Sequence, residues 1–264
     1  MAKIYTNTKT LDRFISDYTD DPTEAEYLIL GSRPIDITPF NNLKGIFRCG
    51  VGTDNLPDTS VPIALPSEKT KHIIYSEVAT FTVSQILTLS YNDVGTVMPW
   101  SKNKRDSFFN KKVLVVGTGK IGSLVVSTLE TICKDLVEYD LRYGSNQTPL
   151  EDLIKEADIV TLHVPHTEDT HEFIDPTIMK DDAILINSAR GQLVNEDKLY
   201  EWLHDNPKAQ AAFDVFWKEP YEGKLLDLPN FVRTPHVAST CNQFIEGLYA
   251  DFVNFMEVQD YKNK

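Results

Sequence analysis

This sequence of 264 residues has few cysteines and no long apolar run. The three cysteines, Cys49, Cys133 and Cys241, are odd in number and far apart, and their spacing is not that of a metal site or a disulfide framework. The opening segment MAKIYTNTKT lacks the apolar core of a signal peptide, and no segment has the length of apolar sequence that spans a bilayer. We therefore expect a soluble, cytoplasmic protein with no bound metal and no membrane partner.

Basic residues are also in the minority. There are 26 lysines and arginines against 39 aspartates and glutamates, which gives a formal net charge of −13. A nucleic-acid-binding surface needs clustered Lys and Arg, so we expect no nucleic-acid partner. The excess acidity favours solubility, and an anionic substrate would need a local basic pocket to bind.

The chain divides by its pattern near Lys112. Before it, segments 27–30 and 45–47 read as short strands, 77–91 reads as a long, mostly buried helix, and the polar, basic segment 99–111 ends that helix. After it, strands and helices alternate. The expected strands are 113–116, 136–139, 158–162, 183–186, 209–213 and 231–233, and the expected helices are 120–132, 149–156 and 195–204. Apolar strands separated by helices predict a parallel sheet that is covered on both faces.

A glycine-rich turn follows the first of these strands. Gly117, Gly119 and Gly122 flank Lys120 and Ile121 in the segment GTGKIG, between the strand KVLVV and a predicted helix. Such glycines permit a tight turn, close approach of a pyrophosphate and close packing of helix on strand.

Asp140 ends the next predicted strand, where a carboxylate meets the ribose hydroxyls of a dinucleotide. The turn and this acid together predict a dinucleotide site that prefers NAD to NADP, because a carboxylate repels a 2′-phosphate. Arg142, two residues further on, either weakens this preference or is a solvated loop arginine.

Three further segments follow predicted strands, at the sheet edge where ligands bind. They carry Arg190 in INSARG, Glu219 in FDVFWKEP and His236 in TPH. An arginine offers a fork for a carboxylate, a histidine exchanges a proton near neutral pH, and a glutamate holds that histidine protonated. Taken singly, each residue is equally consistent with an ordinary surface position.

Seven motifs occur in order along the chain: CGVGTDN (49–55), EVATFTVSQILTL (77–89), VVGTGKIG (115–122), ADIVTLHVPHTEDT (157–170), LINSARGQLVN (185–195), FDVFWKEP (213–220) and TPHVAST (234–240). Through them the sequence resembles the D-isomer-specific 2-hydroxyacid dehydrogenase family from about Tyr27 to Cys241, with some resemblance to its phosphoglycerate dehydrogenase branch. The resemblance implies an NAD-dependent enzyme that moves a hydride to or from C2 of a D-2-hydroxy acid or 2-keto acid.

The resemblance also implies roles for single residues. Arg190 would bind and polarise the 2-oxo acid, His236 would be the general acid and base, and Glu219 would pair with His236. The backbone N–H groups of Val51 and Gly52 would bind the substrate carboxylate. Asp214 would contact the nicotinamide carboxamide, and further cofactor contacts would come from Pro165, Ser188, Ala189 and Ala238. His163 is expected to be structural.

The implied fold is a Rossmann-type doubly wound parallel sheet inserted into a smaller flavodoxin-like substrate domain. We expect the NAD-binding domain at 77–240 and the substrate domain at 1–76 plus 241–264, with the active site in a cleft between them. A homodimer is also implied, with contacts from the first domain and helix 77–91. Two alternatives are an NAD-sensing binding protein and an inactive homologue.

Several features depart from the family pattern. The chain is short, mainly in its first domain, which lacks a strand–helix unit, and Thr80 stands where the family motif usually has Glu. Arg33 in GSRP and Arg48 in FRCG resemble the arginine-bearing loops of the phosphoglycerate dehydrogenase branch. A phosphorylated substrate is therefore an alternative to the small, unphosphorylated keto acid that we favour.

Overall fold

The computed structural model describes residues 2–143 and 149–262. The chain forms two compact units, one of residues Met1–Ile74 with Ser239–Lys264 and one of residues Tyr75–Ala238. The sequence predicted the corresponding domain boundaries at 76/77 and 240/241. We call these unit 1 and unit 2 and describe each by itself. Among the residues so described, no helix has the length and apolar character needed to cross a membrane.

Unit 1 contains a four-stranded parallel sheet of β1 (Ile4–Thr6), β2 (Tyr27–Leu30), β3 (Gly45–Arg48) and β4 (Ile63–Ala64). The predictions of β2 and β3 are confirmed, whereas β1 and β4 are too short to show a periodicity. The strands lie in sequence order, β1-β2-β3-β4, without the reversal of the flavodoxin-like order. The connections 7–26, 31–44 and 49–62, all within the described residues, contain no helix.

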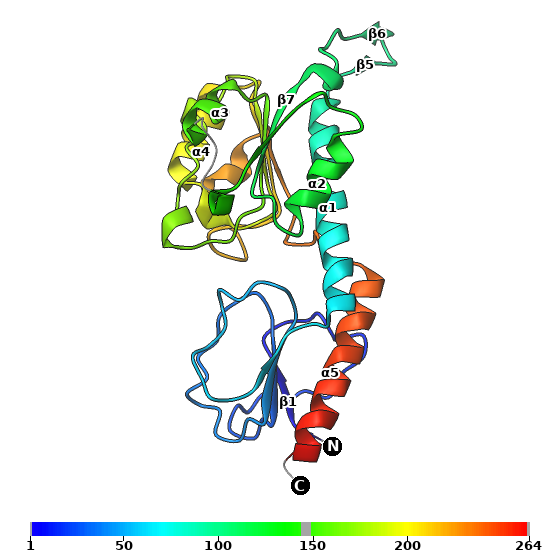
Figure 1. Cartoon of the computed structure of the whole chain (residues 1–264), viewed down its shortest axis with the longest axis vertical. Coiled ribbons are helices and arrows are strands. Elements are labelled where there is room, and N and C mark those ends of the chain that lie inside the picture. Colours follow the sequence, from blue (N-terminus) through cyan, green and yellow to red (C-terminus); the bar gives the residue numbers. More distant parts are fainter. Residues whose placement is uncertain (1, 144–148, 263–264) are drawn as a thin grey trace. The chain divides into compact units, whose positions relative to one another are not determined.

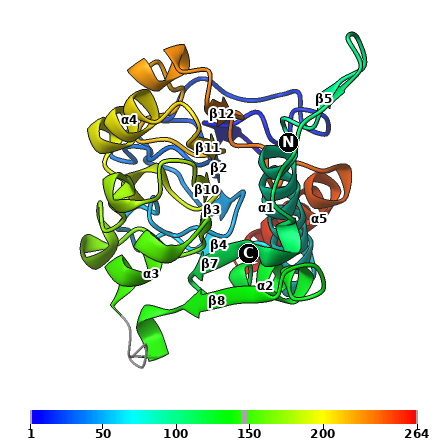
Figure 2. The ribbon, with the colours of Figure 1, turned by 90° about the horizontal axis from the view of Figure 1, so that it is seen from above.

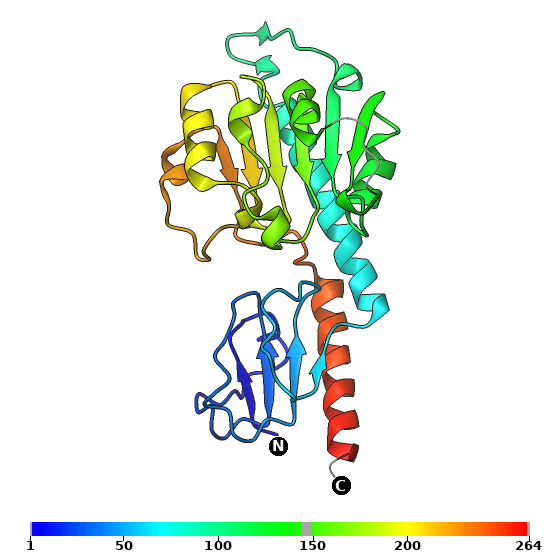
Figure 3. The same cartoon turned by 60° about the vertical axis from the view of Figure 1, so that its left-hand side comes forward.

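Aromatic side chains fill the core of unit 1. Helix α5 (Asn242–Lys262) lies along the sheet and packs Phe252 and Phe255 against Tyr27 and Phe47, with ring centroids 5.5 to 6.4 Å apart (Figure 3). A Cβ at Gly45 would lie 2.5 Å from the Phe255 ring, so the ring packs directly on the backbone of this glycine. The predicted return of segment 241–264 as a helix is confirmed.

Unit 2 contains a six-stranded parallel sheet in the order β12-β11-β10-β9-β7-β8. Its strands are β7 (Lys112–Val116), β8 (Asp135–Tyr139), β9 (Ile159–Leu162), β10 (Ile184–Asn187), β11 (Gln210–Phe213) and β12 (Phe231–Arg233). The chain reverses direction across the sheet between β7 and β9, which creates the crevice where ligands bind in doubly wound folds. The predicted Rossmann-type sheet is confirmed.

Helices cover both faces of this sheet (Figure 2). Helices α1 (Glu68–Ser90) and α2 (Gly122–Leu129) bury Ile86 and Val125 against one face. Helices α3 (Leu150–Glu156) and α4 (Glu196–Asp205) pack on the other face. This double burial explains why the strands of unit 2 are nearly continuous apolar runs.

Helix α1 begins at Glu68, so the prediction that it begins at 77 is wrong at that end. Ser67 caps the helix, because its Oγ accepts a hydrogen bond from Thr70 N at 3.3 Å. The Ser67 N–H in turn donates to Asp251 Oδ2 of α5 at 2.8 Å, a contact within unit 1. The boundary between the two units falls inside α1.

Segment 91–111 forms a hairpin of β5 (Gly95–Thr96) and β6 (Ser101–Lys102) that extends away from the rest of unit 2 (Figure 1). The 3₁₀ helix η1 (Phe108–Asn110) then leads into β7. The other 3₁₀ helices are η2 (Leu141–Tyr143), η3 (Glu168–Thr170), η4 (Pro176–Ile178), η5 (Gly191–Leu193) and η6 (Lys224–Asp227).

Candidate active site

The glycine-rich turn joins β7 to α2, beside the crevice between β7 and β9. Gly117 has φ +94°, and a Cβ there would lie 2.7 Å from the His163 carbonyl. A Cβ at Gly122 would lie 1.9 Å from the Gly117 carbonyl oxygen, which no side chain can tolerate. A Cβ at Gly119, in contrast, has no atom within 4 Å. The fold itself requires Gly117 and Gly122, whereas the space beside Gly119 is open, as the approach of a pyrophosphate needs.

The residues around the turn have structural roles as well. Ile121 packs into the core beneath α2, and Lys120 is exposed. Burial lowers the pKa of His163 to about 4, and its Nε2 lies 3.0 Å from Thr161 Oγ1. His163 is therefore neutral below the turn. Pro165 follows β9, and its carbonyl accepts a hydrogen bond from Thr170 Oγ1 at 2.8 Å.

The different surroundings of the glycines give a prediction. Gly119→Ala is expected to leave the melting temperature unchanged and to weaken NADH binding at least about tenfold, because the new methyl group stands only in the way of the ligand. Gly122→Ala is the matched control and is expected to lower the melting temperature, because its Cβ meets backbone. Thermal unfolding and NADH fluorescence titration measure both effects. A lower melting temperature for Gly119→Ala would contradict the assignment.

Asp140 lies directly after β8 and faces the turn. Its Oδ2 accepts hydrogen bonds from Thr118 N at 2.8 Å and Thr118 Oγ1 at 3.0 Å. Arg142 forms a bidentate ion pair with it, with Nε 2.9 Å from Oδ1 and Nη2 2.6 Å from Oδ2. The Arg142 hydrogen bond and those of Thr118 hold the pKa of Asp140 well below its usual value, against the effect of burial. The carboxylate is therefore charged, and Thr118, which the sequence did not single out, holds it.

His236 and Glu219 lie in direct contact in unit 2. His236 Nδ1 is 3.0 Å from Glu219 Oε1 and 2.9 Å from Oε2, and the Phe216 N–H donates to Oε1 at 3.3 Å. Burial raises the pKa of Glu219, but the hydrogen bond and charge of His236 outweigh it, with help from Phe216 and Arg190, so that the pKa is lowered. The pairing expected of Glu219 and His236 is thus present, and the charge of Arg190 reaches the same carboxylate.

The loop after β10 carries Arg190 to this pair. Asn187 is completely buried at the end of β10, where its Nδ2 donates to Arg190 O at 2.8 Å and its Oδ1 accepts from Ala189 N at 3.0 Å. A Cβ at Gly191 would lie 2.3 Å from the Phe216 backbone, so the Arg190 loop lies directly against the loop that leads to Glu219. Asn187 is therefore a positioning residue, and its one sequence signal is a polar side chain that ends an apolar strand.

His236 adopts a left-handed backbone conformation with φ +55°, which costs roughly 1–2 kcal/mol outside glycine. The buried carboxylate of Asp214 holds the loop in this shape. Its Oδ1 accepts from Thr234 Oγ1 at 2.6 Å and Val237 N at 2.8 Å, and its Oδ2 accepts from Ala238 N at 2.9 Å. Asp214 thus positions the His236 loop, and its contact with a nicotinamide carboxamide stays a prediction.

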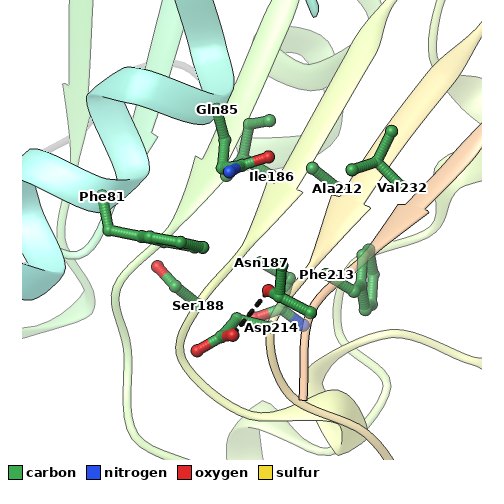
Figure 4. Close-up of a pocket in the computed structure, with 10 residues that line it drawn as sticks. Phe81, Gln85, Ile186, Asn187, Ser188, Ala212, Phe213, Asp214 and Val232 are labelled. Carbon is green, nitrogen blue, oxygen red and sulfur yellow. Dashed lines mark hydrogen bonds between the residues drawn. The ribbon is translucent and has the colours of Figure 1, made fainter. Parts of the chain in front are cut away.

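Helix α1 adds residues to this edge of the sheet. Phe81 from α1 lies beside Ser188, which follows β10, and Gln85 from α1 lies beside Ile186 of β10 (Figure 4). Ser188 Oγ lies 2.7 Å from Thr82 Oγ1, which ties the Ser188 loop to the helix. The space among these side chains, about 10 Å³, has room for about one water molecule. Ser188 and Ala189, where the sequence predicts cofactor contacts, lie in the loop that leads from β10 to Arg190.

Val51 and Gly52 lie in unit 1, in the loop after β3. Arg48 shapes this loop: it is only 5% exposed, and its Nε donates to Gly52 O at 3.2 Å and to Asn55 Oδ1 at 3.1 Å. Arg33 donates from Nη2 to Asn7 O at 3.0 Å. Both arginines that the sequence suggested as phosphate anchors are therefore bound to their own unit.

Comparison with known proteins supports the assignment of these residues to a dehydrogenase site. Residues 92–238 match the family model "D-isomer specific 2-hydroxyacid dehydrogenase, NAD binding domain". The chain is 30% identical to a hydroxypyruvate reductase of Thermotoga maritima over 75% of its own length and 72% of the relative. It is 33% identical to a glycerate dehydrogenase of Methylorubrum extorquens over 60% of its own length and 55% of the relative.

Solved structures share the fold. A phosphoglycerate oxidoreductase from Vibrio cholerae matches with a TM-score of 0.76 and 21% identity over 99% of this chain and all of that one. A D-lactate dehydrogenase from Aquifex aeolicus, complexed with NAD and lactic acid, matches with a TM-score of 0.77 and 22% identity over 96% of this chain and 94% of that one.

The matched part spans about half the length of several curated relatives, such as the 42% of a D-3-phosphoglycerate dehydrogenase from Methanocaldococcus jannaschii. The part that matches the family model includes the whole glycine-rich turn and the segments that carry Arg190, Glu219 and His236. On this evidence the chain contains the family's NAD-binding domain and belongs to the D-isomer-specific 2-hydroxyacid dehydrogenase family.

Proposed function

We propose that this protein is an NAD-dependent oxidoreductase that interconverts a D-2-hydroxy acid and the corresponding 2-keto acid. The observation that supports this most is the contact of His236 Nδ1 with Glu219 at 2.9 Å, beside Arg190 and on the same sheet as the glycine-rich turn. A binding protein would need the turn and Asp140 but not this pair. We also propose that unit 1 supplies the substrate domain.

Each residue then has a chemical role. The bound nicotinamide supplies or accepts the hydride. In reduction, His236 donates its proton to the keto oxygen, and Glu219 holds the imidazole oriented and favours its protonated form. Arg190 binds the carboxylate and carbonyl of the substrate, which orients it and stabilises the developing negative charge on the oxygen. The N–H groups of Val51 and Gly52 are proposed to bind the substrate carboxylate.

We propose a small, unphosphorylated substrate. A phosphate would need cationic side chains in addition to Arg190, and the burial of Arg48 and its hydrogen bonds within its own loop argue against its holding one. Glyoxylate, hydroxypyruvate and pyruvate therefore come before phosphohydroxypyruvate as candidates.

The test is NADH oxidation, followed by absorbance, with these four acids and a branched 2-keto acid. We expect turnover with at least one unphosphorylated acid. NADH binding without turnover of any acid would instead favour an NAD-sensing protein or an inactive homologue.

We further propose a homodimer formed through the hairpin of β5 and β6. Val97, Met98 and Trp100 at its tip are 74%, 89% and 76% exposed, in a part of unit 2 beyond the helix where we expected dimer contacts. Exposed apolar groups of this size mark interaction sites. The nearby Lys102 and Lys104 carry a charge opposite in sign to the net charge of −13 on a second copy of the chain.

Trp100→Asp is expected to convert the dimer to a monomer at micromolar concentration, because it places a charge in a buried apolar contact. Light scattering after size exclusion measures the mass. Tyr261→Asp is the control, since Tyr261 is 82% exposed but lies on α5, and it should leave the dimer intact. A wild-type chain that is monomeric under these conditions would refute the proposal.

We also propose a cytoplasmic location. All three cysteines are free in the structure, and thiols persist in a reducing compartment.

A further inference from the structure

The adenosine end of the proposed NAD site holds an arginine where the ribose hydroxyls would bind. The Asp140 side chain is 7% exposed and already accepts hydrogen bonds from Thr118 N, Thr118 Oγ1 and three nitrogens of Arg142, its backbone N included. A carboxylate offers about four lone-pair sites. A ribose that donates two hydroxyls to Asp140 must therefore compete with Arg142.

Arg142 can leave this position more easily than Thr118 can. Its side chain is 59% exposed, so water can solvate the guanidinium once it leaves the Asp140 carboxylate. Thr118 holds Asp140 partly through its backbone N–H, in the turn that the glycines fix. A ribose that binds the Asp140 carboxylate would therefore displace the Arg142 guanidinium rather than Thr118.

A 2′-phosphate would meet the same arginine differently. Asp140 alone would repel the phosphate dianion, but the Arg142 fork beside it matches phosphate geometry and carries the opposite charge. One side chain would therefore weaken binding of a 2′-hydroxyl cofactor and strengthen binding of a 2′-phosphate cofactor.

We propose that Arg142 is a specificity-determining residue that narrows the preference of this protein for NAD over NADP. It competes with the adenosine ribose for Asp140 and provides the contact for a 2′-phosphate. The inference rests on the proposed dinucleotide site. It predicts that removing the guanidinium widens the preference for NAD.

Two probes without nicotinamide isolate the adenosine end: 5′-AMP and adenosine 2′,5′-bisphosphate. Isothermal titration of the full chain gives a Kd for each. In Arg142→Gln we expect 5′-AMP to bind more tightly and the bisphosphate more weakly, so that the ratio of the bisphosphate Kd to the AMP Kd rises at least about tenfold. Arg142→Lys keeps the charge without the fork, so we expect it to bind 5′-AMP more tightly and retain most of its bisphosphate affinity.

Arg105→Gln is the matched control, because it removes the same charge from unit 2 at a residue that stacks on the Tyr91 ring. In this control the ratio of the bisphosphate Kd to the AMP Kd should stay at the wild-type value. A ratio in Arg142→Gln within twofold of wild type, or an equal rise in Arg105→Gln, would overturn the role of Arg142. Failure of wild type to bind either probe would overturn the dinucleotide site itself, whereas the expected shift in a protein without turnover would overturn only the proposed reaction.

Discussion

Replacing His236 by asparagine is expected to lower kcat for 2-keto acid reduction at least about a hundredfold, the scale of general acid catalysis. Asparagine suits this test better than alanine, because it tolerates the left-handed backbone of His236, φ +55°. The amide nitrogen of the new side chain can donate a hydrogen bond to Glu219 but cannot deliver a proton to the substrate. Steady-state kinetics at saturating NADH give the value.

The variant must otherwise behave as wild type. Its melting temperature and its Kd for NADH should be unchanged, because the glycine-rich turn and Asp140 are untouched. A turnover near that of wild type would refute the role of His236.

Glu219→Gln separates orientation from charge. The hydrogen bond and charge of His236 lower the pKa of Glu219 against the effect of burial, and Glu219→Gln removes the carboxylate charge while its amide oxygen can still accept a hydrogen bond from His236 Nδ1. Without that charge, kcat for 2-keto acid reduction should be lower than in wild type, because Glu219 no longer contributes its charge to the catalytic pair. Because the folded pKa of Glu219 is below its ordinary value of 4.5, its stabilising effect is complete above that pH and is lost only in acid. A kcat equal to that of wild type would show that the Glu219 charge has no part in the reaction.

Arg190→Gln is expected to reduce kcat/KM about 10²- to 10³-fold, since it removes a preorganised cation from the carbonyl oxygen on which charge develops. Both kcat and KM should change, because the same group binds the substrate carboxylate. Arg190→Lys should recover only part of the loss, because a lysine keeps the charge but not the fork.

Arg105→Lys, away from the catalytic pair, is the control for conservative replacement of an arginine. NADH affinity should be retained in all three variants. A variant Arg190→Gln with unchanged kcat/KM would show that another cation holds the substrate.

Much of unit 2 could be predicted because its signals are local. The strands appear as short apolar runs, and the glycine spacing and Asp140 identify the dinucleotide site. Arg190, Glu219 and His236 could be grouped because parallel strands bring their carboxyl ends to one edge. Unit 1 was less predictable, since β1 and β4 have only three and two residues. The start of α1 was also missed, because its first turn is a polar segment.

The supporting contacts could not be predicted, because they depend on residues distant in the chain. Asp214 holds the loop of His236 through two N–H groups and a hydroxyl, and Gly191 admits the Phe216 backbone. From the sequence, two hypotheses fitted Arg142: a solvated loop arginine or a residue that modifies cofactor choice. Its bidentate contact with Asp140 decides in favour of a position at the site.

The most direct test of the proposed reaction uses NADH deuterated at nicotinamide C4 in the transferred position. The substrate is the unphosphorylated 2-keto acid that turns over fastest, glyoxylate excepted, because glycolate has no D and L forms. Mass spectrometry and chiral chromatography of the product show where the label goes. We predict one deuterium at C2 of the D-2-hydroxy acid. In His236→Asn the same labelled product should form at a much lower rate than in wild type. An unlabelled product, an L-2-hydroxy acid, or no product with any of the keto acids would contradict the proposed function.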